Sequence, residues 1–170
     1  GFHHSGLQKD EDEGMNFDFS PEQEELRRQA ARFFEKQGRC VEARKALDDE
    51  KPFDREDWAS LAEMGWLGAA IGEDYGGVGL GYLELCVLFE EFGKAIAPLP
   101  FASTILAAEA IKRAGSPAQK NKYLPKIAEG QLIGTVALFD AGQRTAFAAP
   151  HTTAVNGVIS GLKSPVADLE

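Results

Sequence analysis

The chain has 170 residues and a formal net charge of −9, and 44% of its residues are hydrophobic. This length and composition allow one globular domain, or one domain and part of a second. No apolar run reaches the roughly 18–20 residues that a membrane-spanning helix needs. The acidic balance, without a stripe of lysine and arginine, argues against nucleic acid and anionic membrane surfaces as partners.

The first 14 residues are interpreted as an expression tag and linker, with the natural start at Met15. They contain two of the three histidines, so His151 is the only other one, and we expect no metal site made of protein ligands. The two cysteines, Cys40 and Cys86, have no CxxC spacing. We expect Cys86 in a helical core, and the chain fits a reducing, cytoplasm-like compartment.

Capping signals predict where several helices begin. Ser20-Pro21-Glu22-Gln23 places a serine cap before a proline, and the glutamine completes a capping box. Ser116-Pro117-Ala118-Gln119 repeats this arrangement. Asp54 is expected to cap another helix that ends at Gly65, and a weaker helical segment covers Val41 to Leu47.

A glycine-rich segment, residues 67–81, separates these helices from a long apolar one. Its Gly76-Gly77-Val78-Gly79 run lacks the GxGxxG and Walker spacings, so we interpret it as a turn and not as a phosphate cradle. Apolar residues of the long helix are expected to form one core-facing stripe: Tyr82, Leu85, Cys86, Phe89 and Phe92. Charged residues are expected on or near its opposite face: Glu84, Glu90, Glu91 and Lys94.

The pattern changes from helical to strand-like in the last part of the chain. Ser103 to Ala114 is expected to be helical, and Pro125 should divide the next helical stretch in two. Leu132 to Phe139 then predicts a strand. Two shorter strands are expected near Thr152–Val155 and Val158–Ser160, joined by an Asn156-Gly157 hairpin turn.

The predicted fold is therefore mainly α, with two parts. A helical bundle domain covers residues 15–130, and residues 131–170 form the first strands of a β-barrel-like domain. A β unit of about 40 residues is too small to be stable alone, which favours a fragment of a longer protein.

Five segments, in order and spacing, resemble the acyl-CoA dehydrogenase family. They are Phe17–Gln23, Trp58–Trp66, Glu73–Gly79, Glu90–Gly93 and Tyr123–Gly130. The resemblance implies an N-terminal helical domain, a middle β domain and a C-terminal helix bundle. It also implies FAD, oxidation of an acyl-CoA thioester to its trans-2-enoyl product, an electron-accepting flavoprotein and a homo- or hetero-oligomer. The family's catalytic glutamate lies in the C-terminal bundle, so no residue of this chain is expected to be the base.

The same resemblance nominates flavin contacts, at positions where this chain departs from its relatives. Phe139 stands where relatives have the threonine of a Thr-Glu-Pro run, so only backbone amides near Leu138 remain as donors there. Thr145 keeps a hydroxyl at the position of a serine that contacts flavin and thioester. Pro165 and Ala167 replace a tryptophan and a threonine that face the flavin in many members.

Substrate contacts are nominated by the same resemblance. Thr145 is one, and Phe101 and Ser103 are expected near the fatty chain, although an ordinary helix start explains these two equally well. The Lys163-Ser164-Pro165-Val166 sequence is similar to that of relatives that degrade steroid side chains as unequal subunit pairs. Two alternatives stay open: a non-catalytic assembly subunit, and a flavin oxidase or monooxygenase of the same fold.

Overall fold

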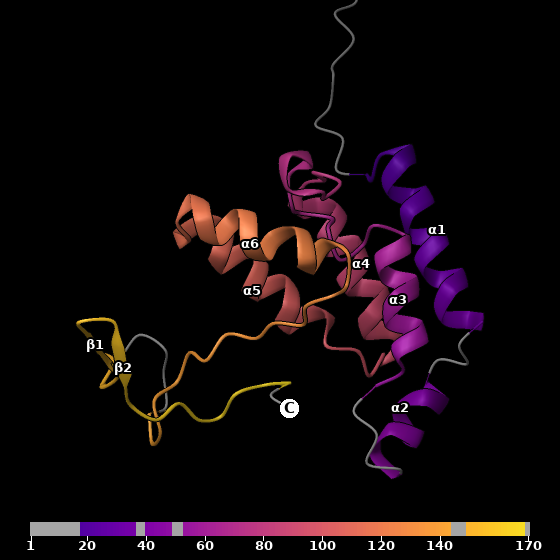
Figure 1. The fold of residues 1–170 in the computed structure, drawn as a ribbon. Coiled ribbons are helices and arrows are strands. Elements are labelled where there is room, and N and C mark those ends of the chain that lie inside the picture. The colour runs from indigo at the N-terminus through magenta and orange to yellow at the C-terminus, as the bar shows by residue number, and fades with distance from the viewer. Residues whose placement is uncertain (1–17, 37–39, 49–52, 144–148, 169–170) are drawn as a thin grey trace, which may run out of the picture.

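The computed structural model describes residues 18–36, 40–48, 53–143 and 149–168. These ranges are mainly helical, as predicted, and a short β ribbon lies beside the helices (Figure 1). The elements are α1 (Pro21–Lys36), α2 (Cys40–Asp48), α3 (Arg55–Glu63), the 3-10 turn η1 (Glu73–Tyr75), α4 (Tyr82–Ala95), α5 (Phe101–Ala114), α6 (Pro117–Ala128), β1 (Thr153–Val155) and β2 (Val158–Ser160). Across the described ranges, no helix combines the length and hydrophobicity that crossing a membrane requires.

The helix starts confirm the capping signals. The Ser20 hydroxyl accepts a hydrogen bond from the Gln23 backbone N–H at 3.2 Å, and the Gln23 side chain accepts one from the Ser20 N–H at 3.0 Å. Ser116 and Gln119 form the same reciprocal pair before α6. The Asp54 carboxylate accepts from two N–H groups of the first turn of α3. These bonds satisfy donors that a helix leaves unpaired at its N-terminus.

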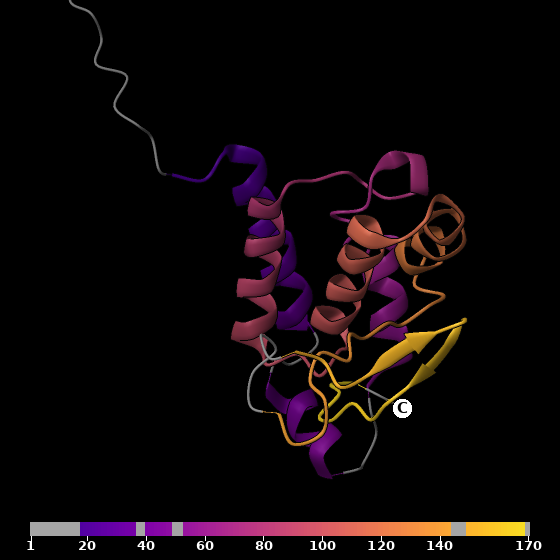
Figure 2. The same cartoon turned by 90° about the vertical axis from the view of Figure 1, so that its left-hand side faces the viewer.

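An aromatic cluster joins α1, α4 and α5. Phe92 of α4 stacks on Phe101 of α5, with ring centroids 4.1 Å apart and planes 13° apart. Its edge contacts Phe34 of α1 at 4.7 Å, and Trp66 lies 6.5 Å away. Helices α1 and α4 lie side by side in both views (Figure 1 and Figure 2). Each buried aromatic side chain contributes about 1.5–3 kcal/mol to stability.

The buried side of α4 differs from the predicted stripe. Leu85 and Phe92 are buried, but Tyr82 is 55% exposed, Phe89 is 36% exposed and Cys86 is also exposed. The prediction of Tyr82, Cys86 and Phe89 as core residues was wrong. The apolar surface of α4 is wider than the part that the core buries. Phe89 and Tyr82 still contact α5, since the Phe89 ring lies 5.2 Å from that of Phe101 and the Tyr82 hydroxyl bonds Glu109, but both side chains stay open to solvent.

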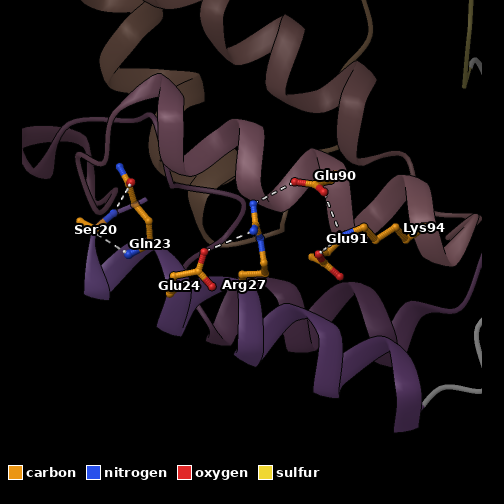
Figure 3. Close-up of polar contacts among 7 residues, drawn as sticks. All are labelled: Ser20, Gln23, Glu24, Arg27, Glu90, Glu91 and Lys94. Carbon is orange, nitrogen blue, oxygen red and sulfur yellow. Dashed lines mark hydrogen bonds and ion pairs between the residues drawn. The ribbon is translucent and has the colours of Figure 1, made fainter. Parts of the chain in front are cut away.

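Charged residues line the contact between α1 and α4 (Figure 3). Arg27 of α1 pairs with Glu24 at 3.3 Å and with Glu90 of α4 at 3.0 Å, and Lys94 pairs with Glu90 at 2.9 Å. Lys94 also pairs with Glu91 at 2.7 Å. Glu91 is buried, so its predicted place on the outer face was wrong. The ammonium of Lys94 supplies the partner that a buried carboxylate requires.

Helix α6 continues through Pro125, so the predicted division there was wrong. Proline inside a helix loses one backbone hydrogen bond and costs about 3 kcal/mol. Leu124 and Ile127, on either side of it, are fully buried in a second apolar cluster with α5 and the glycine-rich loop. The Glu129 N–H donates to the Pro125 carbonyl at 3.0 Å. Burial on both sides of the proline therefore offsets its cost.

The predicted hairpin is confirmed, but the longer strand is not. Strands β1 and β2 pair antiparallel with Val155 opposite Val158, and Asn156 and Gly157 between them have φ of 50° and 78°. The segment Leu132–Phe139 forms no strand. A strand needs a ladder of backbone hydrogen bonds. Within the described ranges only the Phe139 carbonyl, at the end of this segment, is bonded to a neighbouring extended segment, by the Ser164 N–H at 2.9 Å.

The glycine-rich loop folds back on itself through backbone hydrogen bonds. The Val78 N–H donates to the Gly68 carbonyl at 3.0 Å, and the Gly79 N–H donates to the Ile71 carbonyl at 2.8 Å. A Cβ at Gly77 would lie 2.1 Å from the Ile71 carbonyl oxygen. Only glycine fits this close approach, which gives the loop a structural role.

We predict that Gly77→Ala lowers the free energy of unfolding by about 2–3 kcal/mol, because the backbone must move to admit the methyl group. The matched control is Gly93→Ala inside α4, where a Cβ meets nothing within 4 Å. That control should raise stability by about 0.5–1 kcal/mol, since alanine favours helix. Urea denaturation of both variants measures the difference. Equal free energies of unfolding for the two variants would contradict the close approach at Gly77.

A polar cluster links Tyr82, the first residue of α4, to α5. Glu109 pairs with Lys112 at 2.6 Å and with Arg113, and accepts a hydrogen bond from the Tyr82 hydroxyl at 2.7 Å. Partial burial raises the pKa of Glu109, but the bonds from Lys112, Tyr82 and Arg113 outweigh that effect and lower the pKa to about 2. Lys112 also donates to the Ala70 carbonyl at 3.0 Å.

The Glu109 contribution to stability should depend on pH. Its folded-state pKa of about 2 lies below the ordinary 4.5, so the contribution is present above pH 4.5 and is lost as pH falls from 4.5 towards 2. We expect Glu109→Gln to cost about 1 kcal/mol at pH 7 and nothing near pH 2. Urea unfolding across this pH range measures the difference, with exposed Glu63→Gln as the control. A constant difference at all pH values would contradict this assignment.

Candidate functional site

The segment that follows α6 is attached to α5 by a buried threonine. The Thr104 hydroxyl accepts a hydrogen bond from the Gly134 N–H at 3.2 Å and donates to the Gly134 carbonyl at 3.4 Å. A Cβ at Gly134 would lie 2.7 Å from the Cβ of Ala107, so glycine permits this close approach. Ile133 packs against the aromatic cluster. The helical domain thus determines where the following loops begin.

Beyond this attachment, two loops meet on either side of the β1–β2 hairpin. The Ser164 N–H donates to the Phe139 carbonyl at 2.9 Å, and the Ala141 N–H donates to the Leu162 carbonyl at 3.0 Å. The Lys163 ammonium lies 3.5 Å from the Leu138 carbonyl oxygen. The two loops therefore run antiparallel and in contact at this point.

A buried carboxylate lies at the centre of this contact. Asp140 is 2% exposed, and its Oδ1 lies 2.8 Å from Lys163 Nζ and accepts a hydrogen bond from the Thr152 hydroxyl at 2.5 Å. Its Oδ2 accepts from the backbone N–H groups of His151 and of Thr152, the latter at 3.3 Å. These bonds from Lys163, Thr152 and His151 hold the pKa of Asp140 well below its usual range, against the opposing effect of burial. The carboxylate is ionised at neutral pH.

Four of the nominated flavin contacts lie at this meeting of the loops. Leu138 and Phe139 precede Asp140 directly, and Pro165 and Ala167 follow Lys163 within four residues. The fifth, Thr145, lies outside the described residues.

The nominated substrate contacts lie at the start of α5. Phe101 is buried against Phe92 and its ring centroid is 5.2 Å from that of Phe89. Ser103 is buried, and its hydroxyl donates to the Pro100 carbonyl at 3.1 Å. In the described chain both residues therefore belong to the packing between helices.

At the nominated flavin positions that the structure describes, only backbone groups can donate hydrogen bonds. Phe139, Pro165 and Ala167 have no side-chain donor. The N–H groups of Leu138 and Phe139 donate to no other residue in the described part of the chain. The described loops supply no flavin-facing side-chain donor at the nominated positions.

The sequence alone did not indicate Asp140 as a site residue. The available signal was a single carboxylate in a strand-like apolar segment. Such a charge is buried only when it has a partner, so it indicates a paired group. The partners, Thr152 and Lys163, are 12 and 23 residues further along the chain, at spacings that no local pattern specifies.

Comparison with known proteins identifies the family. Residues 20–131 match the family model described as acyl-CoA dehydrogenase, N-terminal domain. An acryloyl-CoA reductase (NADH) from Anaerotignum propionicum is 32% identical over 151 residues, which are 88% of this chain and 38% of that protein. The chain belongs to the acyl-CoA dehydrogenase family, of which it contains the N-terminal helical domain.

Two solved structures agree with this assignment. A variant of the Tcur3481-Tcur3483 steroid ACAD is 37% identical with a TM-score of 0.74, over 85% of this chain and 41% of that chain. A chain of the ChsE4-ChsE5 complex from Mycobacterium tuberculosis is 32% identical with a TM-score of 0.70, over 88% and 39%. The chain spans about two fifths of the length of these relatives.

We predict that Thr104→Val lowers the free energy of unfolding by about 1–3 kcal/mol, because it leaves the Gly134 N–H and carbonyl without their buried partner. Thr104→Ser keeps the hydroxyl and is the matched control, with a smaller loss from the missing methyl group. Urea denaturation measures both. A valine variant at least as stable as the serine variant would mean that the hydroxyl does not hold this segment.

Proposed function

We propose that the protein takes part in the FAD-dependent oxidation of an acyl-CoA thioester to its trans-2-enoyl product. It acts as a flavin-binding subunit or as the partner of one in an oligomer. The observation that carries this proposal is the meeting of Leu138–Phe139 with Ser164–Ala167 at the end of an acyl-CoA dehydrogenase N-terminal domain. We also propose a middle β domain that begins near residue 131, where the family match ends.

The role proposed for this chain is to hold and orient the flavin. Bound FAD supplies the acceptor for the β-hydride, and the electrons then pass to an electron-accepting flavoprotein. The backbone N–H groups of Leu138 and Phe139 bind the ring, and Pro165 and Ala167 form a wall against it. Thr145 contributes a hydroxyl to flavin and thioester. The catalytic base comes from outside residues 1–170.

The start of α5 is proposed to border the acyl chain. Phe101 shapes that border through its stack on Phe92. The Ser103 hydroxyl donates to the Pro100 carbonyl, so it presents an oxygen acceptor and no free proton. Both residues act by defining the shape of the space and not by chemistry.

An unequal subunit pair is the form that the sequence favours. Two of the similar structures are named as pairs, Tcur3481-Tcur3483 and ChsE4-ChsE5, and the former is called a steroid ACAD. The loss of side-chain donors at Phe139, Pro165 and Ala167 weakens flavin binding by one chain alone. A partner that completes the site compensates for that loss.

The test is a visible absorption spectrum of the full-length polypeptide, expressed alone and with the protein encoded beside it, before and after a mixture of acyl-CoAs is added. We expect a flavin band that acyl-CoA bleaches, in the co-expressed sample and more weakly or not at all in the polypeptide alone. A phenylalanine-to-threonine change at position 139 restores a side-chain donor, and should increase the flavin content of the polypeptide alone.

Other outcomes favour the alternatives. Flavin that acyl-CoA does not bleach, with oxygen consumed on a substrate that is not a thioester, would favour an oxidase or monooxygenase. Samples without flavin under both conditions would favour the assembly subunit and would contradict the proposed function.

A further inference from the structure

We propose that Asp140 is a positioning residue whose carboxylate holds the two flavin-facing loops in one fixed arrangement. This inference rests on the proposed flavin-binding function and adds a residue to it. Asp140 itself does not contact the flavin in this proposal. It acts through the backbone of Leu138–Phe139 on one side and of Ser164–Ala167 on the other.

The contacts of Asp140 connect three separate parts of the chain. The carboxylate binds the Lys163 ammonium at 2.8 Å and the Thr152 hydroxyl at 2.5 Å, and it accepts two backbone N–H groups from His151 and Thr152. The backbone around it is also tied, because Asp140 forms an isolated β-bridge with Lys163. A single carboxylate thus joins the loop around Asp140, the start of the hairpin at Thr152 and the return loop at Lys163.

Apolar burial contributes little to holding these two loops together. Both strands of the hairpin are exposed along their whole length, and Leu138 and Leu162 are 53% and 69% exposed. Within the described ranges, the loop contact therefore depends on polar bonds. Hydrogen bonds to a charged group are stronger and more directional than neutral ones, and they fix the orientation of the groups that they join.

The nominated flavin contacts lie close to the Asp140–Lys163 pair along the chain. Phe139 is adjacent to Asp140, and Ser164 is adjacent to Lys163, and these two residues share a backbone hydrogen bond of 2.9 Å. A change at Asp140 should therefore move the Leu138 and Phe139 N–H groups relative to Pro165 and Ala167. The two loops would then no longer be aligned for the flavin, whereas the helical core would be unaffected.

The test compares Asp140→Asn with wild type in the full-length polypeptide, co-expressed with its neighbour. Asparagine keeps the size but removes the charge and places a donor beside donors. We expect roughly tenfold weaker FAD binding, measured by fluorescence titration of the deflavinated protein. We also expect an altered visible circular dichroism spectrum of the bound flavin, which a uniform loss of stability would not produce.

The matched control is Glu91→Gln, which removes another buried carboxylate paired with a lysine, Lys94 at 2.7 Å, but on α4. It should lower the unfolding temperature and leave the FAD dissociation constant and the flavin spectrum unchanged. Lys163→Arg should retain most of the FAD affinity, whereas Lys163→Met should lose it as Asp140→Asn does. If Asp140→Asn does not fold, Thr152→Val removes one bond to the same oxygen, and its FAD affinity decides the question.

The outcomes separate this inference from the proposed function. Wild type that binds FAD, with Asp140→Asn, Lys163→Met and Thr152→Val of the same FAD affinity and flavin spectrum, would overturn the positioning role alone. Wild type and partner that hold no FAD would overturn both. Weaker FAD binding in Asp140→Asn and Lys163→Met but not in Lys163→Arg or Glu91→Gln would support the role.

Discussion

The stack of Phe92 on Phe101 is the contact on which the arrangement of the molecule depends. Phe92 also meets Phe34, so one ring on α4 sets the positions of both α1 and α5. The position of α5 in turn determines where Thr104 lies, and Thr104 holds the Gly134 backbone. The loops that carry the candidate site therefore take their starting point from an aromatic contact in the helical core.

Different forces hold the two parts of the chain together. In the helical part, buried apolar area is the main source of stability, and charged pairs such as Arg27–Glu90 lie at the edge of the helix contact (Figure 3). After Gly134 the described chain buries little apolar surface, and a charged network around Asp140 joins the loops. Such a network gives a specific geometry with modest stability, which suits a site that must align backbone donors.

The side chains of Phe139, Pro165 and Ala167 carry no hydrogen-bond donor, so the proposed flavin site depends on backbone N–H groups at these loops. Backbone N–H groups keep their place whatever the side chain is, as long as the loops themselves stay in register. In the proposed site, the Asp140–Lys163 pair keeps the two loops in that register.

Local signals in the sequence were enough to place the three capped helix starts and the Asn156-Gly157 hairpin, because capping bonds and tight turns join residues only two to four positions apart. Only the tertiary structure decided which side of α4 is buried, whether α6 continues through Pro125 and whether residues 132–139 pair as a strand. The same holds for the candidate site. The order of motifs indicated the nominated positions, but only the fold identified the partners of Asp140. Each of these outcomes depends on neighbours that are distant along the chain, and local periodicity carries no information about them.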